Sequence, residues 1–337
     1  MRAQAGDGRW TGAGPPGTGG RVGPWVNLVP VTTQPVRRPS LRGAALAALA
    51  PDLVVEVLDE ATSTNAVAAD RARAGAPEGR LVVAEHQTAG RGRLDRTWET
   101  PPRSGLTFSL VLRPTVPPGD WPWLPLLTGH TIAKTLRAEG WATGVKWPND
   151  VLVEDRADPT APARKVAGVL LERVETPTGP AAVVGVGLNV SLTADELPVP
   201  TATSLALEPR HAAGPGDVGR DAGRDGGPDL GVRNGGPDRT DLLVLLATAL
   251  REAYDAWQAG GSAATARLRS SYAAACLTVG RDVRVELPGG EPLVGRATGV
   301  VGSGRLVVVG PAGEVAVSAG DVVHVRPAAP GAAGRDR

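Results

Sequence analysis

The feature that most constrains the fold is an ordered series of short apolar segments between residues 53 and 190. Two of them predict helices: 63–75 has Thr62 or Ser63 as N-cap and finishes at Gly75, and 124–139 carries apolar residues at roughly helical spacing before Gly140. The other segments are typical of strands: 53–60, 80–87, 105–114, 144–153, 165–174 and 181–190. Because several strands follow one another without a helix between them, the order predicts an α+β domain with a mixed, mostly antiparallel sheet.

The C-terminal part of the chain has a different pattern. A further helix is predicted where apolar side chains share one face, at Leu243, Leu246, Leu250, Tyr254 and Trp257. Residues 281–327 contain only strand and turn signals, with the turns PGG, GSG and PAG at regular intervals. This segment predicts a small SH3-like barrel of five or six strands.

Two stretches are too poor in large apolar residues to fold on their own. Residues 1–37 are rich in glycine and proline, and 208–240 repeats Gly-Arg-Asp and Gly-Gly-Pro-Asp. We expect a disordered leader at 1–37, unless it lies upstream of the natural start, and a disordered insertion at 208–240. The predicted domains are then a catalytic domain at 38–275, the barrel at 278–327 and a disordered tail at 328–337.

Composition excludes several classes of protein. The net charge is +1, with 36 basic and 35 acidic residues, which argues against a general nucleic-acid binder. A single cysteine, Cys276, cannot form a disulfide framework and fits a reducing compartment. Apolar runs are too short for a membrane helix, and the first residues lack the apolar core of a secretion signal. We therefore expect a cytoplasmic protein without a membrane partner.

The segment AGRGRLDRTW at 89–98 carries the strongest chemical signal. Gly90 and Gly92 let backbone N–H groups approach a ligand, and arginines stand beside them at 91, 93 and 96. Guanidinium groups bind carboxylate or phosphate oxygens in bidentate fashion. The alternative is an arginine- and glycine-rich surface loop, or one that contacts RNA.

Three further motifs have both a chemical and a structural interpretation. In KWPND at 146–150, a lysine, an asparagine and an aspartate together suit phosphate and Mg²⁺, although the segment also reads as a strand-end turn. Lys165 opens an apolar strand and can hold an anion if it points into a cavity; the alternative is a solvated lysine. The glycines of GVGLNV at 185–190 allow close approach of a ligand, or of another strand in the core.

These four motifs, with STN at 63–65, occur in an order that resembles the biotin–protein ligase family. The resemblance covers residues 53–327 apart from the 208–240 insertion. It implies a class II synthetase-like catalytic domain that uses ATP and Mg²⁺ to form biotinyl-5′-AMP from biotin. It further implies transfer of biotin to a lysine of a biotin carboxyl carrier protein or domain of an acyl-CoA carboxylase.

The resemblance also assigns roles by position in the motifs. It implies contacts to biotin from Ser63, Thr64, Asn65, Gln87, Arg91, Gly92, Arg93 and Lys165. It implies nucleotide and metal surroundings made by Arg96, Trp98, Lys146, Asn149, Asp150 and Asn189. Among these, Lys165, Arg91 and Arg93 are the expected catalytic residues, and the metal ligands are left open.

Two departures from the family pattern and two alternative functions remain. Asp95 stands where many relatives have glycine, and residues 1–50 show no helix-turn-helix, so we expect a ligase that does not bind DNA. A lipoate–protein ligase shares the adenylation chemistry, but the STN motif and the barrel favour biotin. A nucleic-acid-binding module is disfavoured by the neutral charge balance and by the lack of interleaved aromatics. Whether the chain forms a homodimer is left open.

Overall fold

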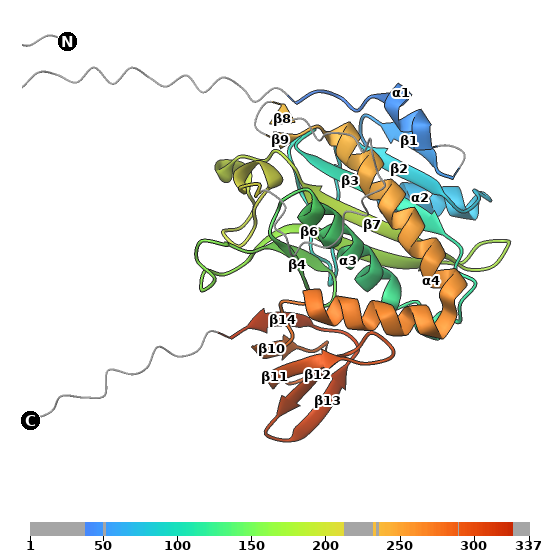
Figure 1. Cartoon of the computed structure of the whole chain (residues 1–337). Helices are drawn as coiled ribbons and strands as arrows, with labels where there is room; N and C mark the ends of the chain where they lie inside the picture. Colours follow the sequence, from blue (N-terminus) through green and yellow to red (C-terminus); the bar gives the residue numbers. More distant parts are fainter. Residues whose placement is uncertain (1–37, 50–51, 212–231, 234–235, 289, 326–337) are drawn as a thin grey trace, which may run out of the picture. The chain divides into compact units, whose positions relative to one another are not determined.

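A seven-stranded sheet forms the centre of the larger domain (Figure 1). The computed structural model describes residues 38–49, 52–211, 232–233, 236–288 and 290–325, so the expected leader and tail lie outside the described residues. The strand order is β1-β2-β3-β7-β6-β5-β4. The bounds are β1 Val54–Leu58, β2 Arg80–Ala84, β3 Gly105–Leu112, β4 Thr143–Lys146, β5 Asp150–Val153, β6 Arg164–Val174 and β7 Ala181–Asn189.

The strand directions confirm the predicted mixed sheet. Strands β1 and β2 are parallel, whereas each other neighbouring pair in this sheet is antiparallel. The parallel pair requires a crossover, and helix α2, Thr64–Arg73, supplies it. The segment 144–153, predicted as one strand, is instead a hairpin. Pro148 removes a backbone donor at its turn, so the chain reverses and β5 pairs with β4.

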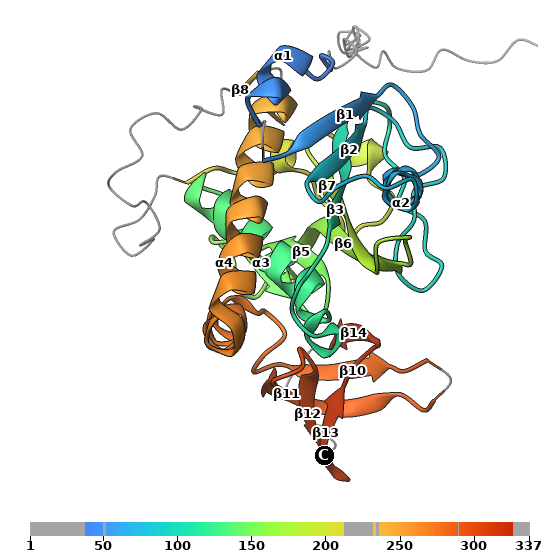
Figure 2. The ribbon, with the colours of Figure 1, turned by 90° about the vertical axis from the view of Figure 1, so that its right-hand side faces the viewer.

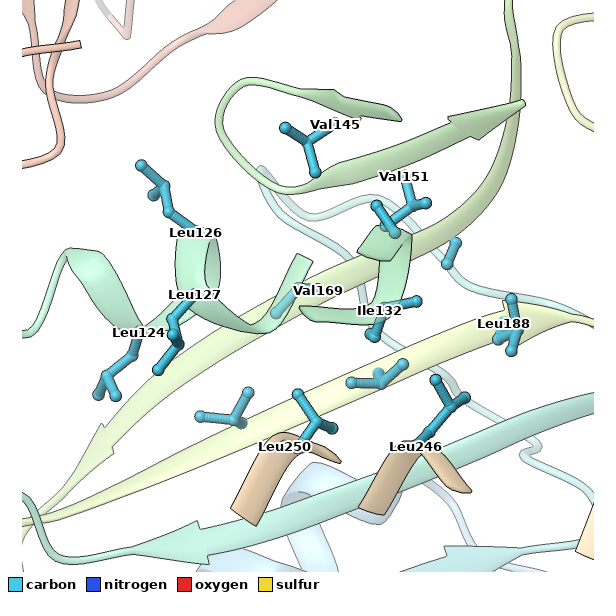
Figure 3. Packing of buried hydrophobic residues seen from close by; sticks show 14 of the residues in the cluster. Leu124, Leu126, Leu127, Ile132, Val145, Val151, Val169, Leu188, Leu246 and Leu250 are labelled. Atoms are coloured by element: carbon cyan, nitrogen blue, oxygen red, sulfur yellow. The ribbon is translucent and has the colours of Figure 1, made fainter. Parts of the chain in front are cut away.

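Helices α3 and α4 pack on one face of the sheet and bury most of the core (Figure 3). Helix α3 spans Trp123–Ala138, and α4 spans Arg239–Ala275 with a break at Gly261, where φ is +50°. Side chains such as Ile132 of α3 and Leu246 of α4 contact strand residues such as Leu188, and all three are fully buried. The apolar periodicity seen in the sequence thus becomes the helix–sheet interface.

Helix α2 lies on the opposite face of the sheet (Figure 2). Its contact residues are small: Ala68 and Ala72 are fully buried against strand residues that include Val82 and Val183. Alanines let the helix approach the sheet closely. Ser63 occupies the N-cap position, so α2 begins beside the middle of the sheet.

Both ends of the segment 208–240, where an insertion is expected, belong to the folded domain. Residues 212–231 lie outside the described part, but Glu208 is buried and pairs with Arg164. At the other end Asp238 caps α4, and the buried Arg239 pairs with Glu85. A residue with a buried ionic partner belongs to the folded domain, whatever the composition of its neighbours.

Several short elements complete the larger domain. They are α1 Gly43–Leu46, η1 Ala47–Leu49, η2 Pro118–Asp120, η3 Ala194–Glu196, η4 Leu205–Leu207, β8 Val232–Arg233 and β9 Gly236–Pro237. None of the described helices is long and apolar enough to cross a membrane.

The C-terminal segment forms the predicted small β domain. It is a five-stranded antiparallel sheet in the order β13-β12-β11-β10-β14, consistent with an SH3-like fold. Its strands are β10 Asp282–Glu286, β11 Leu293–Val300, β12 Leu306–Gly310, β13 Gly313–Val317 and β14 Asp321–His324. Two indole N–H groups of the larger domain donate to its backbone, Trp123 to Gly302 at 2.7 Å and Trp147 to Gly304 at 2.9 Å. The two domains are therefore joined by buried hydrogen bonds.

Candidate active site

One pocket gathers nearly all of the predicted site residues. It lies on the α2 face of the sheet and encloses roughly 780 Å³ including its open mouth, a size suited to a small-molecule ligand. The predicted residues that line it are Ser63, Thr64, Asn65, Gln87, Arg91, Gly92, Arg93, Arg96, Trp98, Asn149, Asp150 and Lys165. Lys146 and Asn189 do not line it.

The side chain of Asn189 has a structural use instead. It is buried, and its amide donates to the Thr203 carbonyl at 2.9 Å, which fixes the chain after β7. Lys146 ends strand β4, and its charge adds to the effect of burial in lowering the pKa of His324 in the C-terminal domain. The assignment of these two residues to the nucleotide therefore rests on the family resemblance alone.

The bottom of the pocket is made of glycine. Gly168 of β6 and Gly187 of β7 are cross-strand partners, and both line the pocket. A β-carbon at position 187 would lie 2.3 Å from the indole ring of Trp98, and one at position 168 would lie 3.3 Å from it. The absence of side chains lets the tryptophan pack directly on the backbone of two strands.

A β-bulge directs Lys165 into the pocket. The pairing of β6 with β5 skips Val166, and such an extra residue changes which side chains share a face of the sheet. Lys165 consequently extends over Gly168, and its Nζ lies 5.5 Å from the centre of the Trp98 ring. The same Nζ is 2.6 Å from an oxygen of Asp150. The lysine predicted to hold an anion thus points into a cavity and is balanced by a carboxylate.

The arginine-rich segment forms a closed turn over this floor. The backbone N–H of Trp98 donates to the Gly90 carbonyl at 2.8 Å. At the tip, Leu94 and Asp95 have φ of +54° and +56°, a left-handed conformation that favours glycine. A glycine at position 95 would therefore adopt this backbone conformation without strain. The Asp95 side chain is exposed and leaves Arg96 to another partner.

Each arginine of the turn contacts a different element. Arg91 donates to Glu172 of β6 at 2.8 Å, Arg93 donates to Asn149 at 3.1 Å, and Arg96 pairs with Asp321 of the C-terminal domain. Polar pairs, with little apolar contact, therefore hold the turn in place.

Burial affects the arginines unequally. Burial lowers the pKa of Arg93 below its ordinary value, an effect that the nearby carboxylates of Asp150 and Asp321 oppose. The hydrogen bond to Asp321 raises the pKa of Arg96. Both guanidinium groups remain charged at neutral pH, because the ordinary pKa of a guanidinium group lies far above 7. The pocket thus offers cations at one end.

At the other end of the pocket, beside the start of helix α2, the lining side chains of Thr64, Asn65 and Gln87 are neutral amides and hydroxyls, and the ion pair of Arg91 with Glu172 lies behind Asn65. Gln87 accepts hydrogen bonds from the backbone N–H of Thr64 at 2.7 Å and from its hydroxyl at 3.1 Å. Asn65 is buried beside them, and a β-carbon at Gly185 would lie 2.0 Å from its amide oxygen. Such a site suits a ligand with a hydrogen-bonding ring at one end and an anionic group at the other.

The sequence interpretation missed three polar residues that shape the site. Ser109 lies within an apolar strand and contacts Thr64 and Asn65, a signal that a polar residue in a buried strand could have given. Glu172 and Asp321 hold two of the arginines. Asp321 follows a turn of the C-terminal domain, and no local pattern distinguishes it there.

Comparison with known proteins agrees with this geometry. Residues 56–189 match the model of the biotin/lipoate A/B protein ligase family, and residues 278–325 match that of the biotin protein ligase C-terminal domain. The chain is 36% identical over 298 residues to the biotin–[acetyl-CoA-carboxylase] ligase of Mycobacterium tuberculosis, covering 87% of this chain and 97% of that protein. It is 31% identical over 274 residues to the ligase of the same name from Paracoccus denitrificans, covering 79% and 98%.

A solved structure supports the fold. The biotin protein ligase from Aquifex aeolicus in complex with biotin and ATP superposes with a TM-score of 0.60 at 23% identity, covering 81% of this chain and 99% of that one. The chain belongs to the biotin–protein ligase family, because it matches both family models and aligns with nearly the whole mycobacterial enzyme.

Proposed function

We propose that this protein is an ATP-dependent biotin–protein ligase, which forms biotinyl-5′-AMP and transfers biotin to a lysine of a biotin carboxyl carrier domain. The observation that carries the proposal is the division of one pocket into an uncharged polar end and a cationic end. Thr64 and Gln87 lie at the first, and Arg93 and Lys165 at the second. Biotin has the same division, a cyclic urea joined by an aliphatic chain to a carboxylate.

In the first step, a carboxylate oxygen of biotin attacks the α-phosphorus of ATP, and the bond from that phosphorus to the pyrophosphate oxygen breaks. Carboxylate and phosphate repel each other, so cations are needed where they meet. Lys165 is placed for this because its ammonium lies over the glycine floor. In this proposal the reacting oxygens replace Asp150 as partners of Lys165.

In the second step, the neutral amine of a carrier lysine attacks the acyl carbon of the mixed anhydride. The carbon–oxygen bond to AMP breaks, an amide forms and the amine proton is lost. The turn at 90–98 covers the site in this proposal and limits the access of water and of other lysines to the anhydride. Arg91 and Arg93 belong to that turn, and their contacts with Glu172 and Asn149 tie it to the sheet.

Magnesium is expected to accompany ATP. Mg²⁺ is commonly held by one or two carboxylates together with substrate phosphates. Two carboxylates, of Asp150 and Asp321, line the described pocket beside the amide oxygen of Asn149, and this donor set fits such an ion. When bound, the ion neutralises charge on the departing pyrophosphate. The described residues contain no cluster of three or more His, Cys, Asp or Glu side chains suited to a metal.

Trp98 suits the adenine side of the nucleotide site. Its ring is packed on Gly187, and its Nε1 is buried without a hydrogen-bond partner among the described residues. A buried indole N–H without an acceptor is costly, so we infer that a ligand oxygen or nitrogen accepts from it.

The cytoplasmic location and the carrier partner are parts of the same proposal.

The decisive experiment incubates the purified protein with labelled biotin, ATP, Mg²⁺ and a biotin carrier domain. Label should reach the carrier only when ATP is present. Lipoate, offered as a competitor, should not reduce the labelling at concentrations near that of biotin, because its dithiolane ring cannot hydrogen-bond with the polar end. Preferential use of lipoate on a lipoyl domain would replace biotin by lipoate as the substrate.

A further inference from the structure

The polar end of the pocket is held from behind by two residues that do not line it. Glu172 accepts hydrogen bonds on one oxygen, Oε2, from the Asn65 amide at 2.7 Å and from Arg91 at 2.8 Å. On the other side of Asn65, Ser109 Oγ lies 2.6 Å from the amide oxygen and 2.8 Å from the Thr64 hydroxyl. A continuous chain of hydrogen bonds therefore runs from the arginine-rich turn to Thr64.

The carboxylate of Glu172 determines which group donates and which accepts in the other hydrogen bonds of this series. A carboxylate that receives two N–H groups only accepts, so the NH₂ of Asn65 must face Glu172 and its oxygen must face Ser109. Ser109 has a single proton, and the amide oxygen needs it. Because the Ser109 proton is already used, a hydrogen bond across the 2.8 Å contact with Thr64 requires Thr64 as the donor.

The same donor and acceptor roles determine what Thr64 and Gln87 present to a ligand in the pocket. Because the Thr64 hydroxyl proton points to a protein acceptor, Ser109 or Gln87, its lone pairs face the ligand. Gln87 accepts the Thr64 backbone N–H on its oxygen, which leaves its NH₂ free to donate. The polar end thus presents an acceptor beside a donor, and this pattern is complementary to the N–H and C=O groups of a cyclic urea.

We infer that Glu172 is a positioning residue that sets the hydrogen-bond polarity of the biotin site through Asn65 and Ser109, and that its shared oxygen ties this polarity to the arginine-rich turn. The inference rests on the proposed function, since it assigns the urea of biotin to this end. Without the carboxylate, the Asn65 amide keeps only its long 3.4 Å contact with the Leu170 carbonyl, which is too weak to hold the amide in one orientation. The site would then lose its preference for the urea, while the cationic end would be unchanged.

The test uses Glu172→Leu, which removes the acceptor but keeps comparable bulk, and Glu172→Gln, which keeps one acceptor oxygen. Biotin affinity is measured by calorimetry and the KM for ATP by pyrophosphate release. Glu172→Leu should weaken biotin binding about tenfold or more, as expected for a buried donor left without its acceptor. The KM for ATP should change less than about twofold, and Glu172→Gln should restore most of the biotin affinity.

Matched controls separate positioning from folding. Glu175→Leu removes an exposed carboxylate of the next turn, which pairs with Arg173, and should leave biotin affinity unchanged. Ser109→Ala should weaken biotin binding without speeding tryptic cleavage after Arg91, whereas Glu172→Leu should do both. In an Asn65→Ala protein, the additional change Glu172→Leu should weaken biotin binding by less than about a further twofold, because Glu172 acts on biotin through its hydrogen bond to Asn65.

The outcomes distinguish this inference from the proposed function. If the unmodified protein does not bind biotin, the proposed function fails and the inference fails with it. If it binds biotin and Glu172→Leu binds equally well, or if the losses from Asn65→Ala and Glu172→Leu multiply independently, the positioning role is overturned and the ligase function stands. Equal loss of affinity for biotin and ATP in a destabilised Glu172→Leu protein would also overturn it.

Discussion

A β-carbon on Gly187 would lie 2.3 Å from the indole ring of Trp98, closer than two carbon atoms can approach. The contact explains why strand β7 is glycine-rich at this point, and it places the tryptophan against the floor of the pocket. We expect Gly187→Ala to displace Trp98 and to lower kcat/KM for ATP by about tenfold or more, as loss of a packed aromatic contact does. Steady-state pyrophosphate release measures this.

The control for that substitution is Gly299→Ala in the C-terminal sheet, where a β-carbon would meet no atom within 4 Å. It should leave the kinetics unchanged. An unaltered KM for ATP in Gly187→Ala would show that Trp98 does not contribute to nucleotide binding.

Lys165 is predicted to stabilise the charge that develops during adenylation. Removal of one such group costs on the order of 10² to 10³ in kcat, so Lys165→Ala should reduce pyrophosphate release to a comparable extent. Lys134→Ala is the matched control, because Lys134 is exposed on helix α3 and does not line the pocket. Near-normal adenylation by a folded Lys165→Ala protein would exclude the role.

Arg91 and Arg93 are predicted to retain the adenylate. Arg93 joins the turn to Asn149, so Arg93→Gly should loosen the cover and let biotinyl-5′-AMP escape to label other proteins. A streptavidin blot of a mixed lysate at saturating biotin should show bystander labelling for this variant and for Arg91→Gly. The exposed Arg269→Ala should label the carrier alone. If both turn variants also label only the carrier and merely require more biotin, these arginines serve biotin capture instead.

The ion pair of Arg96 with Asp321 ties the turn to the C-terminal domain. Because Arg96 is largely exposed, the pair should contribute less than about 1 kcal/mol to stability, and its effect should be local. Asp321→Asn should speed tryptic cleavage after Arg96, and biotin with ATP should protect the turn in both proteins. Asp282→Asn, which weakens a surface pair with Arg296 in the same sheet, is the control. Equal cleavage of all three proteins would mean that Asp321 does not restrain the turn.

Two half-buried histidines, His130 and His324, should make stability depend on pH. Burial lowers the pKa of His130 and of His324 to about 4, below the ordinary value of 6.5. Between these values the unfolded chain binds more protons than the folded one, so stability is full above about pH 6.5 and falls as the pH drops toward 4. The expected loss between pH 7 and pH 5 is about 2 kcal/mol for His130 and smaller for the less buried His324.

Urea unfolding at the two pH values measures this loss. His130→Gln should flatten the pH dependence, whereas His86→Gln, at a partly exposed site beside Glu60, should not. A stability that is the same at pH 5 and pH 7 in the unmodified protein would show that neither histidine is held neutral by the fold.

The sequence by itself determined the kinds of element and the chemistry that they carry. Apolar periodicity predicted the helices at 124–139 and 243–257, and the cap and final glycine predicted the one at 63–75, because these signals are local and depend on the geometry of single elements. The glycines at 89–98 predicted an irregular loop for the same reason, and anion binding by its arginines stays a prediction. The small C-terminal β domain also followed from local alternation and turn residues.

Only the tertiary structure decided which of these residues meet. The bulge at Val166 turns Lys165 into the pocket, and sequence periodicity assumes a regular strand. Asn189 belongs to one of the motifs that carry the resemblance, yet its side-chain amide donates to the Thr203 carbonyl and so stabilises the fold instead of lining the pocket. Arg96 and Asp321, 225 residues apart, meet because the C-terminal domain packs beside the turn. Contacts between distant segments follow from the packing of whole elements, a property that no local pattern encodes.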